Sequence, residues 1–211
     1  MRLVSVNVSA GRVVCWRGRR IETGIFKEPV AGRIMIRGFN LDGDRQADRT
    51  VHGGEHKAVY AYSAEHYAWW ERELRRPLPF GMFGENLTIE SMDEGDVCVG
   101  DRFRAGNALL EAVQPRLPCF KLGIRFGDAG MVKRFMESGR FGVYFRVLEE
   151  GDVGAGDVVT REWRHPMRFP VSTLVHLLDP VMRGSEMAKR ALELEALPPG
   201  WVQTLRRGQE G

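Results

Sequence analysis

The sequence predicts a mainly β fold of the α+β class, followed by a small appendage of three helices. Up to about residue 163, short β-branched or alternating runs are separated by glycine-containing turns. Two helical patterns interrupt these runs. The sequence pattern changes from strand-like to helical at Arg164-His165-Pro166, and short helical patterns follow one another after it. We therefore expect a β domain over residues 1–165 and a helical appendage over residues 166–211.

The expected strands are short and are bounded by residues that suit tight turns. The dipeptide Gly-Asp recurs at these joints, where Asp bonds its own backbone and Gly accepts a positive φ. The runs that predict strands are 3–8, 12–16, 33–37, 57–62, 108–113, 142–148 and 157–163.

Two helices are expected within the β domain. Residues 63–74 open with Ser63 as a cap and an acidic first turn, and apolar residues then recur on one face. Residues 128–138 show i,i+4 apolar pairs and end before Gly139, a typical helix stop. In the appendage, helices are expected over 172–178, 185–196 and 199–207. Each is too short to persist alone, so they must pack on one another or on the β domain.

Composition excludes several classes of function. The 211 residues carry a formal net charge of only +3, and the arginines are scattered, so neither nucleic acid nor a membrane surface is an expected partner. No apolar run is long enough to cross a bilayer, and residues 1–11 lack a signal-peptide pattern. Three cysteines without regular spacing argue against a disulfide framework. We expect a soluble, cytoplasmic protein.

The segment 114–121 (QPRLPCFK) contains the strongest candidate for chemistry, Cys119. Pro115 and Pro118 stiffen the approach to this cysteine and favour an extended loop. Arg116 and Lys121 flank it, and cations near a thiol favour the reactive, metal-binding thiolate. The alternative is an ordinary buried cysteine. No helix start after Cys119 is apparent from the sequence.

Three further polar segments, 42–48, 51–57 and 83–88, combine glycine with ionisable or amide groups. Their meeting at one mouth of the fold is a hypothesis. His52 and His56 are spaced like zinc ligands on a helix, but the glycines between them disfavour a helix. A role for His52 in ordering its loop is the preferred interpretation. A Cys119–His52 pair for acyl transfer is conceivable, whereas nucleotide-binding and Ser/His/Asp motifs are absent.

Together these segments resemble the MOSC family, the domain found at the C-terminus of molybdenum cofactor sulfurases. The resemblance is carried, in order, by 23–30 (TGIFKEPV), 43–48 (GDRQAD), 51–54 (VHGG), 83–87 (FGENL), 100–101 (GD) and 114–119 (QPRLPC). It covers nearly the whole chain. It implies a β-barrel that binds the molybdenum cofactor (molybdopterin), with Cys119 as the molybdenum ligand.

The resemblance also implies roles for other residues. Lys27 and Arg45 match positions that hold the pterin's phosphate, and Asn86 matches a polar position near the pterin. Arg116 binds the pterin or positions substrate in this interpretation. The remaining residues expected at the cofactor site are His52, Gly53 and Lys121.

The activity implied is reduction of N-hydroxylated compounds, such as hydroxylaminopurine-type base analogues, to amines. The chain shows no flavin or iron–sulfur signature, so the electrons would come from an external flavin or haem protein. Two alternatives stay open: a non-catalytic carrier of the cofactor, and a sulfur carrier with a persulfide on Cys119. The family is also associated with pyridoxal phosphate, but this chain lacks the desulfurase domain that uses it. The appendage is open to three roles: docking a redox partner, forming a homodimer, or packing.

Overall fold

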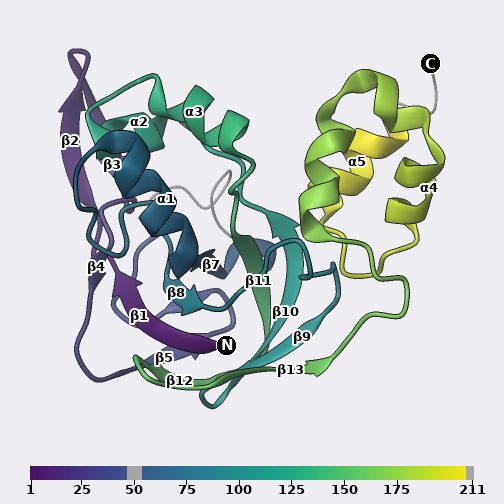
Figure 1. Ribbon diagram of the computed structural model, residues 1–211, viewed down its shortest axis with the longest axis horizontal. Coiled ribbons are helices and arrows are strands. Elements are labelled where there is room, and N and C mark those ends of the chain that lie inside the picture. The colour runs from purple at the N-terminus through teal and green to yellow at the C-terminus, as the bar shows by residue number, and fades with distance from the viewer. Residues whose placement is uncertain (47–53, 208–211) are drawn as a thin grey trace.

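The computed structural model describes residues 1–46 and 54–207. Its centre is a curved, mixed sheet of eight strands in the order β13-β9-β10-β11-β7-β8-β1-β4 (Figure 1). These strands are β1 (Arg2–Val8), β4 (Glu28–Pro29), β7 (Val59–Ser63), β8 (Leu87–Glu90), β9 (Arg102–Ala105), β10 (Ala108–Pro115), β11 (Val143–Glu149) and β13 (Val159–Trp163). All described pairs are antiparallel except β7 with β8, which are parallel. The mainly β, α+β class is thus confirmed.

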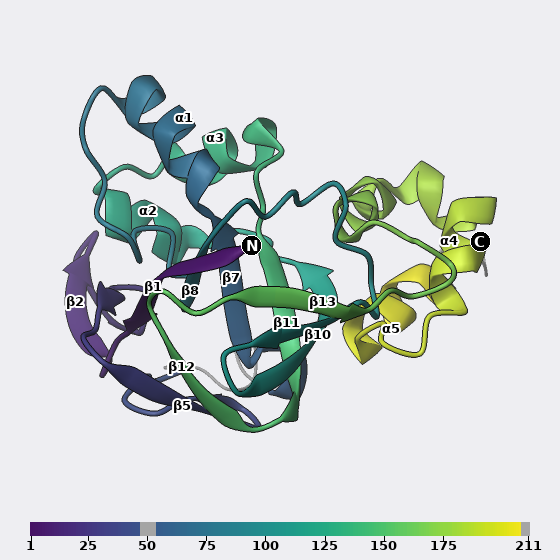
Figure 2. The same cartoon turned by 60° about the horizontal axis from the view of Figure 1, so that its bottom comes forward.

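The large sheet curls so strongly that β1 comes within hydrogen-bond distance of the start of β13. The amide of Leu3 in β1 donates to the carbonyl of Asp157 at 2.9 Å, and the amide of Val159 donates to the carbonyl of Met1 at 3.0 Å. A second, three-stranded sheet, β12-β5-β6, lies beneath it, and a β2–β3 hairpin projects at one side (Figure 2). These strands are β2 (Arg12–Trp16), β3 (Arg19–Thr23), β5 (Arg33–Arg37), β6 (Asn40–Leu41) and β12 (Gly151–Gly154).

Strand β7 is the buried centre of the sheet, because every one of its residues is buried. Helices α1 (Ala64–Leu74), α2 (Phe120–Phe126) and α3 (Met131–Ser138) lie above this region (Figure 1). Their apolar faces form an aromatic core with β7, in which Trp70 donates from Nε1 to the Tyr62 hydroxyl at 2.8 Å. Helix α1 ends at Arg75 in the left-handed conformation, and α3 ends at Gly139 in the same way, as expected for this stop.

The appendage contains two α-helices and two 3₁₀ helices. They are η2 (Val171–Leu178), η3 (Pro180–Gly184), α4 (Glu186–Leu192) and α5 (Pro199–Arg207). The three predicted helices are present, but the first is a 3₁₀ helix, and η3 was not predicted. Pro180 at the start of η3 follows Asp179, whose side chain accepts from the amide of Val181 and caps the turn. Within residues 1–46 and 54–207, no helix has the length and apolar character needed to cross a bilayer.

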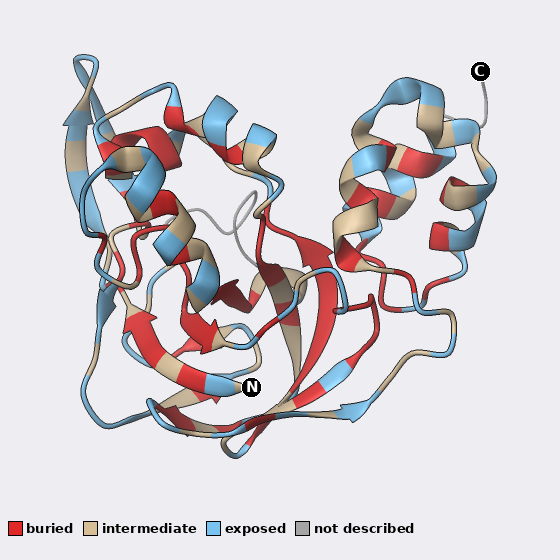
Figure 3. Ribbon diagram, viewed as in Figure 1, coloured by how far each residue is buried: buried red, intermediate tan, exposed pale blue. Residues whose placement is uncertain are grey.

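The appendage shares its core with the sheet. Buried side chains of its helices, including Leu174, Ala191 and Leu205, belong to one hydrophobic cluster with residues of β1, β7 and β10. Figure 3 shows buried segments of the appendage both beside the sheet and between the appendage's own helices. Trp201 of α5 donates from Nε1 to the side-chain oxygen of Gln114 in β10 at 3.0 Å. A domain boundary at residue 165 stays a prediction.

Candidate functional site

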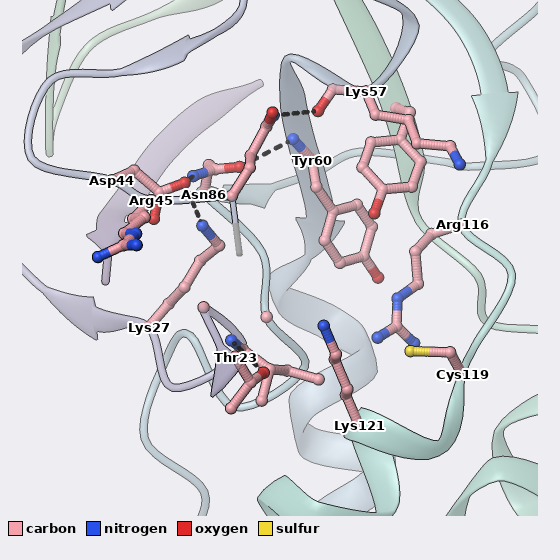
Figure 4. A pocket seen from close by; sticks show the side chains of 15 residues that line it. Thr23, Lys27, Asp44, Arg45, Lys57, Tyr60, Asn86, Arg116, Cys119 and Lys121 are labelled. Atoms are coloured by element: carbon pink, nitrogen blue, oxygen red, sulfur yellow. Dashed lines mark hydrogen bonds and ion pairs between the residues drawn. The ribbon is translucent and has the colours of Figure 1, made fainter. Parts of the chain in front are cut away.

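A pocket of about 610 Å³, counting the open space at its mouth, lies where the loops after β3, β6 and β10 meet the start of β7 (Figure 4). The residues that line it are Thr23, Gly24, Ile25, Lys27, Asp44, Arg45, Gln46, Lys57, Tyr60, Gly84, Asn86, Arg116, Cys119, Lys121 and Tyr144. The three polar segments singled out in the sequence, 42–48, 51–57 and 83–88, each contribute to it. Five of these lining residues are cationic and one is acidic, so the described wall carries a net positive charge.

Six of the eight predicted site residues line this pocket, namely Lys27, Arg45, Asn86, Arg116, Cys119 and Lys121. The other two, His52 and Gly53, lie outside the described residues. Within the described residues, no group of three or more His, Cys, Asp or Glu side chains is arranged to hold a metal ion.

Cys119 lies at the junction between the end of β10 and helix α2. Its backbone is extended, with φ −121° and ψ 173°, and it is the residue that caps the start of α2. The carbonyl of Cys119 accepts from the amide of Leu122 at 2.9 Å, which begins the helix. This corrects the expectation that no helix starts after the cysteine. The helix forms because Leu122 and Phe126 bury one face, and Gly127 ends it at φ 69°.

Arg116 is buried beneath the pocket, with 5% of its surface exposed. Its guanidinium lies 5.6 Å from the ring centre of Tyr60 and 5.1 Å from that of Phe135, as a cation above aromatic faces. Its Nη1 atom is buried and finds no hydrogen-bond partner among the residues that the structure describes. A buried donor of this kind needs a partner, and the pocket beside it is where a ligand would supply one.

Lys57 is a pocket residue that the sequence analysis did not select. It ends the short 3₁₀ helix η1 (Glu55–Lys57), immediately before β7. Burial lowers the pKa of Lys57, and the nearby Cys119 sulfur opposes this shift. In Figure 4, Lys57, Arg116 and Cys119 lie on one side of the pocket, away from Lys27 and Asp44. The histidines of segment 51–57 drew attention to the segment, but the lysine at its end lines the pocket.

Asp44 forms the opposite side of the pocket and binds three donors. Its buried carboxylate accepts from the Lys27 ammonium, from Asn86 Nδ2 at 3.0 Å and from the amide of Ser9 at 2.8 Å. Burial lowers the pKa of Lys27, while Asp44 counteracts this. Arg45 is largely exposed and its guanidinium pairs with Glu22 at 2.8 Å. Both residues expected to hold a phosphate thus have a carboxylate partner.

Glu85 supports the segment that places Asn86 in the pocket. Its buried carboxylate accepts from the Tyr67 hydroxyl, from the Thr88 hydroxyl at 2.9 Å and from the amide of Gly81 at 2.7 Å. The adjacent Asn86 then accepts at Oδ1 from the amide of Tyr60 at 3.1 Å. Gly81 is required here, because its φ is +84° and a Cβ would lie 2.6 Å from the carbonyl oxygen of Lys27.

The buried Glu85 predicts a pH dependence of stability. Burial raises the pKa of Glu85 above its ordinary value of 4.5. The stabilisation from its protonated form is therefore present below pH 4.5 and is lost as the pH rises through the folded-state pKa. We expect the Glu85→Gln variant, which cannot ionise, to lose less stability than the wild type as the pH rises from 4.5 through that pKa. Urea unfolding measures the free energy of unfolding of both proteins from pH 4.5 to 8. Equal pH dependence of that free energy in the two proteins would contradict the expectation.

Comparison with known proteins gives the family. Residues 48–160 match the model of the MOSC domain, and the chain belongs to this family. The chain is 35% identical to the protein YiiM of Escherichia coli over 208 residues, covering 96% of this chain and 91% of that one. It is 32% identical to YiiM of Geobacillus stearothermophilus, whose crystal structure matches with a TM-score of 0.81 over 99% of this chain and 98% of that chain. The similarity to the YiiM proteins therefore extends over nearly the whole of both chains.

A third relative extends the comparison to a longer protein. A chain of Gibberella moniliformis called "Reductase" is 36% identical over 163 residues, which are 74% of this chain but 29% of that protein. This protein is thus related to a chain named as an oxidoreductase. Most of that chain lies outside the match.

The MOSC domain is a type of domain associated with the molybdenum cofactor, and the pocket residues fit that group. A thiolate is a soft ligand, suited to a metal that also binds sulfur. Backbone amides and cations suit a phosphate, and the buried Nη1 of Arg116 calls for an acceptor. Among the described lining residues, the carboxylate of Asp44 opposes an anion, but it already has three donors.

Proposed function

We propose that this protein is a molybdenum-cofactor-dependent reductase that converts N-hydroxylated compounds to amines. The observation that carries the proposal is the single pocket that combines Cys119 with five cationic side chains. The YiiM homology and the relative named as a reductase support an oxidoreductase. The bound cofactor would supply the two-electron redox chemistry of the reaction.

The pocket residues divide into two groups in this proposal. Cys119 would ligate molybdenum through its thiolate, and Arg116 would donate from Nη1 to the pterin or the substrate. Lys27, Arg45 and Asn86 line the opposite side and would hold the phosphate and the polar edge of the pterin. Because Asp44 and Glu22 now pair with the two cations, the phosphate would compete with these carboxylates.

The reaction cleaves one N–O bond and consumes two electrons and two protons. The substrate R–NH–OH is reduced to R–NH₂, and the hydroxyl oxygen leaves as water. The electrons come from an external flavin or haem redox protein. Lys57 has a pKa lowered by burial, so its Nζ is suited to deliver one proton to the departing oxygen. Lys121 lines the same pocket and would help to hold an anionic ligand there.

Expression in a host that makes the molybdenum cofactor tests the proposal. We expect the purified protein to contain molybdenum and to reduce hydroxylaminopurine with a chemical electron donor such as reduced viologen. Elemental analysis measures the metal, and chromatography measures the amine. A molybdenum-replete protein that reduces no N-hydroxylated substrate would contradict the proposal and indicate a carrier. A mass increase of 32 Da on Cys119 without molybdenum would indicate a sulfur carrier.

A further inference from the structure

A second hollow, which we call the appendage groove, opens between helix α5 and the segments around η1 and the end of β10. Counting the open space at its mouth, it spans about 770 Å³. The residues that line it are Gly54, His56, Lys57, Gln114, Leu117, Leu178, Pro198, Pro199, Gly200, Trp201 and Thr204. Figure 2 places α5 beside β10, and the hydrogen bond between Trp201 and Gln114 joins the two. The groove therefore exists only because the appendage packs against the sheet.

The groove adjoins the pocket that Cys119 lines, which we call the Cys119 pocket. Lys57 lines both hollows. Leu117, which lines the groove and is 39% exposed, lies two residues before Cys119 on the same loop. Gln114 fixes this wall: its Nε2 donates to the carbonyl of His56 at 2.8 Å, and its Oε1 accepts from Trp201 at 3.0 Å. A molecule in the groove would thus lie next to the side of the pocket that holds Lys57 and Cys119.

The groove's wall is mostly apolar, with a few polar groups, which is the composition typical of small-molecule sites. Its apolar surface comes from Leu117, Leu178, Pro199 and the buried Trp201. The polar groups include Lys57 and His56, and burial lowers the pKa of His56, which favours the neutral imidazole. Such a wall suits a flat, uncharged ring with polar atoms at its edge. It disfavours a cation, because Lys57 lies at the inner end.

We propose that the appendage groove is the subsite for the ring of a planar, uncharged N-hydroxylated substrate, with the N-hydroxyl group directed past Lys57 toward Cys119. The proposal rests on the function proposed above and adds to it a place for the substrate's ring and a role for the appendage. It assigns α5 to substrate specificity. The two-electron reduction itself would occur at the Cys119 pocket, so a substrate without a ring would not need the groove.

The substitution Thr204→Trp tests the subsite. Thr204 is half-buried on α5, and its hydroxyl donates only to a carbonyl of its own helix, that of Gly200 at 2.8 Å. An indole at this position would fill part of the groove. Gln203→Trp is the matched control, because Gln203 is exposed on the same helix and does not line the groove.

Two substrates separate the effect on the groove from an effect on the chemistry. For hydroxylaminopurine, we expect Thr204→Trp to raise KM about tenfold or more, with kcat changed much less. For N-methylhydroxylamine, which has no ring, kcat/KM should stay within about twofold of the wild type. Gln203→Trp should resemble the wild type with both substrates. Unchanged KM for hydroxylaminopurine in Thr204→Trp would overturn the subsite while leaving the reductase function intact.

Equilibrium dialysis of hydroxylaminopurine without an electron donor gives a readout independent of turnover. We expect weaker binding to Thr204→Trp than to the wild type and to Gln203→Trp. If the wild type binds the purine in this way but reduces nothing, the groove is a binding site and the proposed reductase function fails. Equal binding by all three proteins would overturn the subsite regardless of activity.

Discussion

Replacing Cys119 with serine is expected to lower the molybdenum content and the reductase activity by at least about a hundredfold. Loss of a group that merely orients a metal ligand costs about 10–100-fold in metal affinity or activity, so loss of the thiolate ligand itself should cost no less. A serine hydroxyl stays protonated near neutral pH and is a hard donor, unlike the thiolate. Metal analysis and the rate with a chemical electron donor measure the change.

Cys15→Ser is the matched control for this experiment. Cys15 is exposed on the β2–β3 hairpin, outside the pocket, so its substitution should alter neither metal content nor rate. Thermal unfolding of Cys119→Ser should show an intact fold, because the backbone of Cys119, not its sulfur, begins α2. A folded Cys119→Ser protein with full molybdenum content and wild-type activity would refute the assignment of the ligand.

Asp44→Ala is expected to be the most destabilising single change in the pocket. It leaves the Lys27 ammonium buried without its carboxylate, and removing one partner of a buried ion pair costs about 3–5 kcal/mol. The same change removes an acceptor from Asn86 and from the amide of Ser9. Equilibrium unfolding in urea measures this loss. Adding Lys27→Met to Asp44→Ala should restore part of it, because the stranded charge is then gone.

The ionisation of Lys27 determines how the stability loss of Asp44→Ala depends on pH. Its pKa in the folded protein is below the unfolded value of 10.5, and loss of Asp44 would lower it further. The stability linked to such a group is present above the unfolded pKa and is lost as the pH falls through the folded one. Asp44→Ala should therefore lose most at neutral pH and less as the pH approaches 10.5.

Asp42→Ala provides the control for Asp44→Ala. It lies on the same turn, but it pairs with Arg37 at the surface, where both side chains are about half exposed. Exposed pairs of this kind contribute little, so the unfolding midpoint should barely move. Equal losses from Asp42→Ala and Asp44→Ala would show that the turn itself, and not the buried pair, is what the substitutions disturb.

The sequence predicted the class of fold and several elements to within a few residues. Strands β2 and β5 and helix α5 have the predicted bounds, because their apolar periodicity and their Gly or Pro boundaries agree. Strand β8 (Leu87–Glu90) was not predicted. It is four residues long and pairs on both sides with distant strands, β1 and β7, so its local pattern is too short to identify it.

The site was predicted less completely than the fold, and for a related reason. Cys119, Arg116 and Lys121 were selected because they lie close together in one stiff segment. Asp44 and Lys57 were not, although both lie in segments noted as polar, because only the tertiary structure brings them to opposite sides of one pocket. The helix after Cys119 also escaped prediction. Its seven residues are held by burial of Leu122 and Phe126, with no side-chain cap at its start.

The bond between Lys27 and Asp44 has a further consequence for how the pocket is filled. The ammonium is compensated by a carboxylate of the polypeptide, so this buried charge needs no bound anion to neutralise it. An anion that binds Lys27, as proposed above, would exchange with a carboxylate that stays tethered nearby. The same tethered group can return when the anion leaves. Binding and release of the anion would thus be reversible steps of the folded protein. The anion-free protein would then be able to bind another anion.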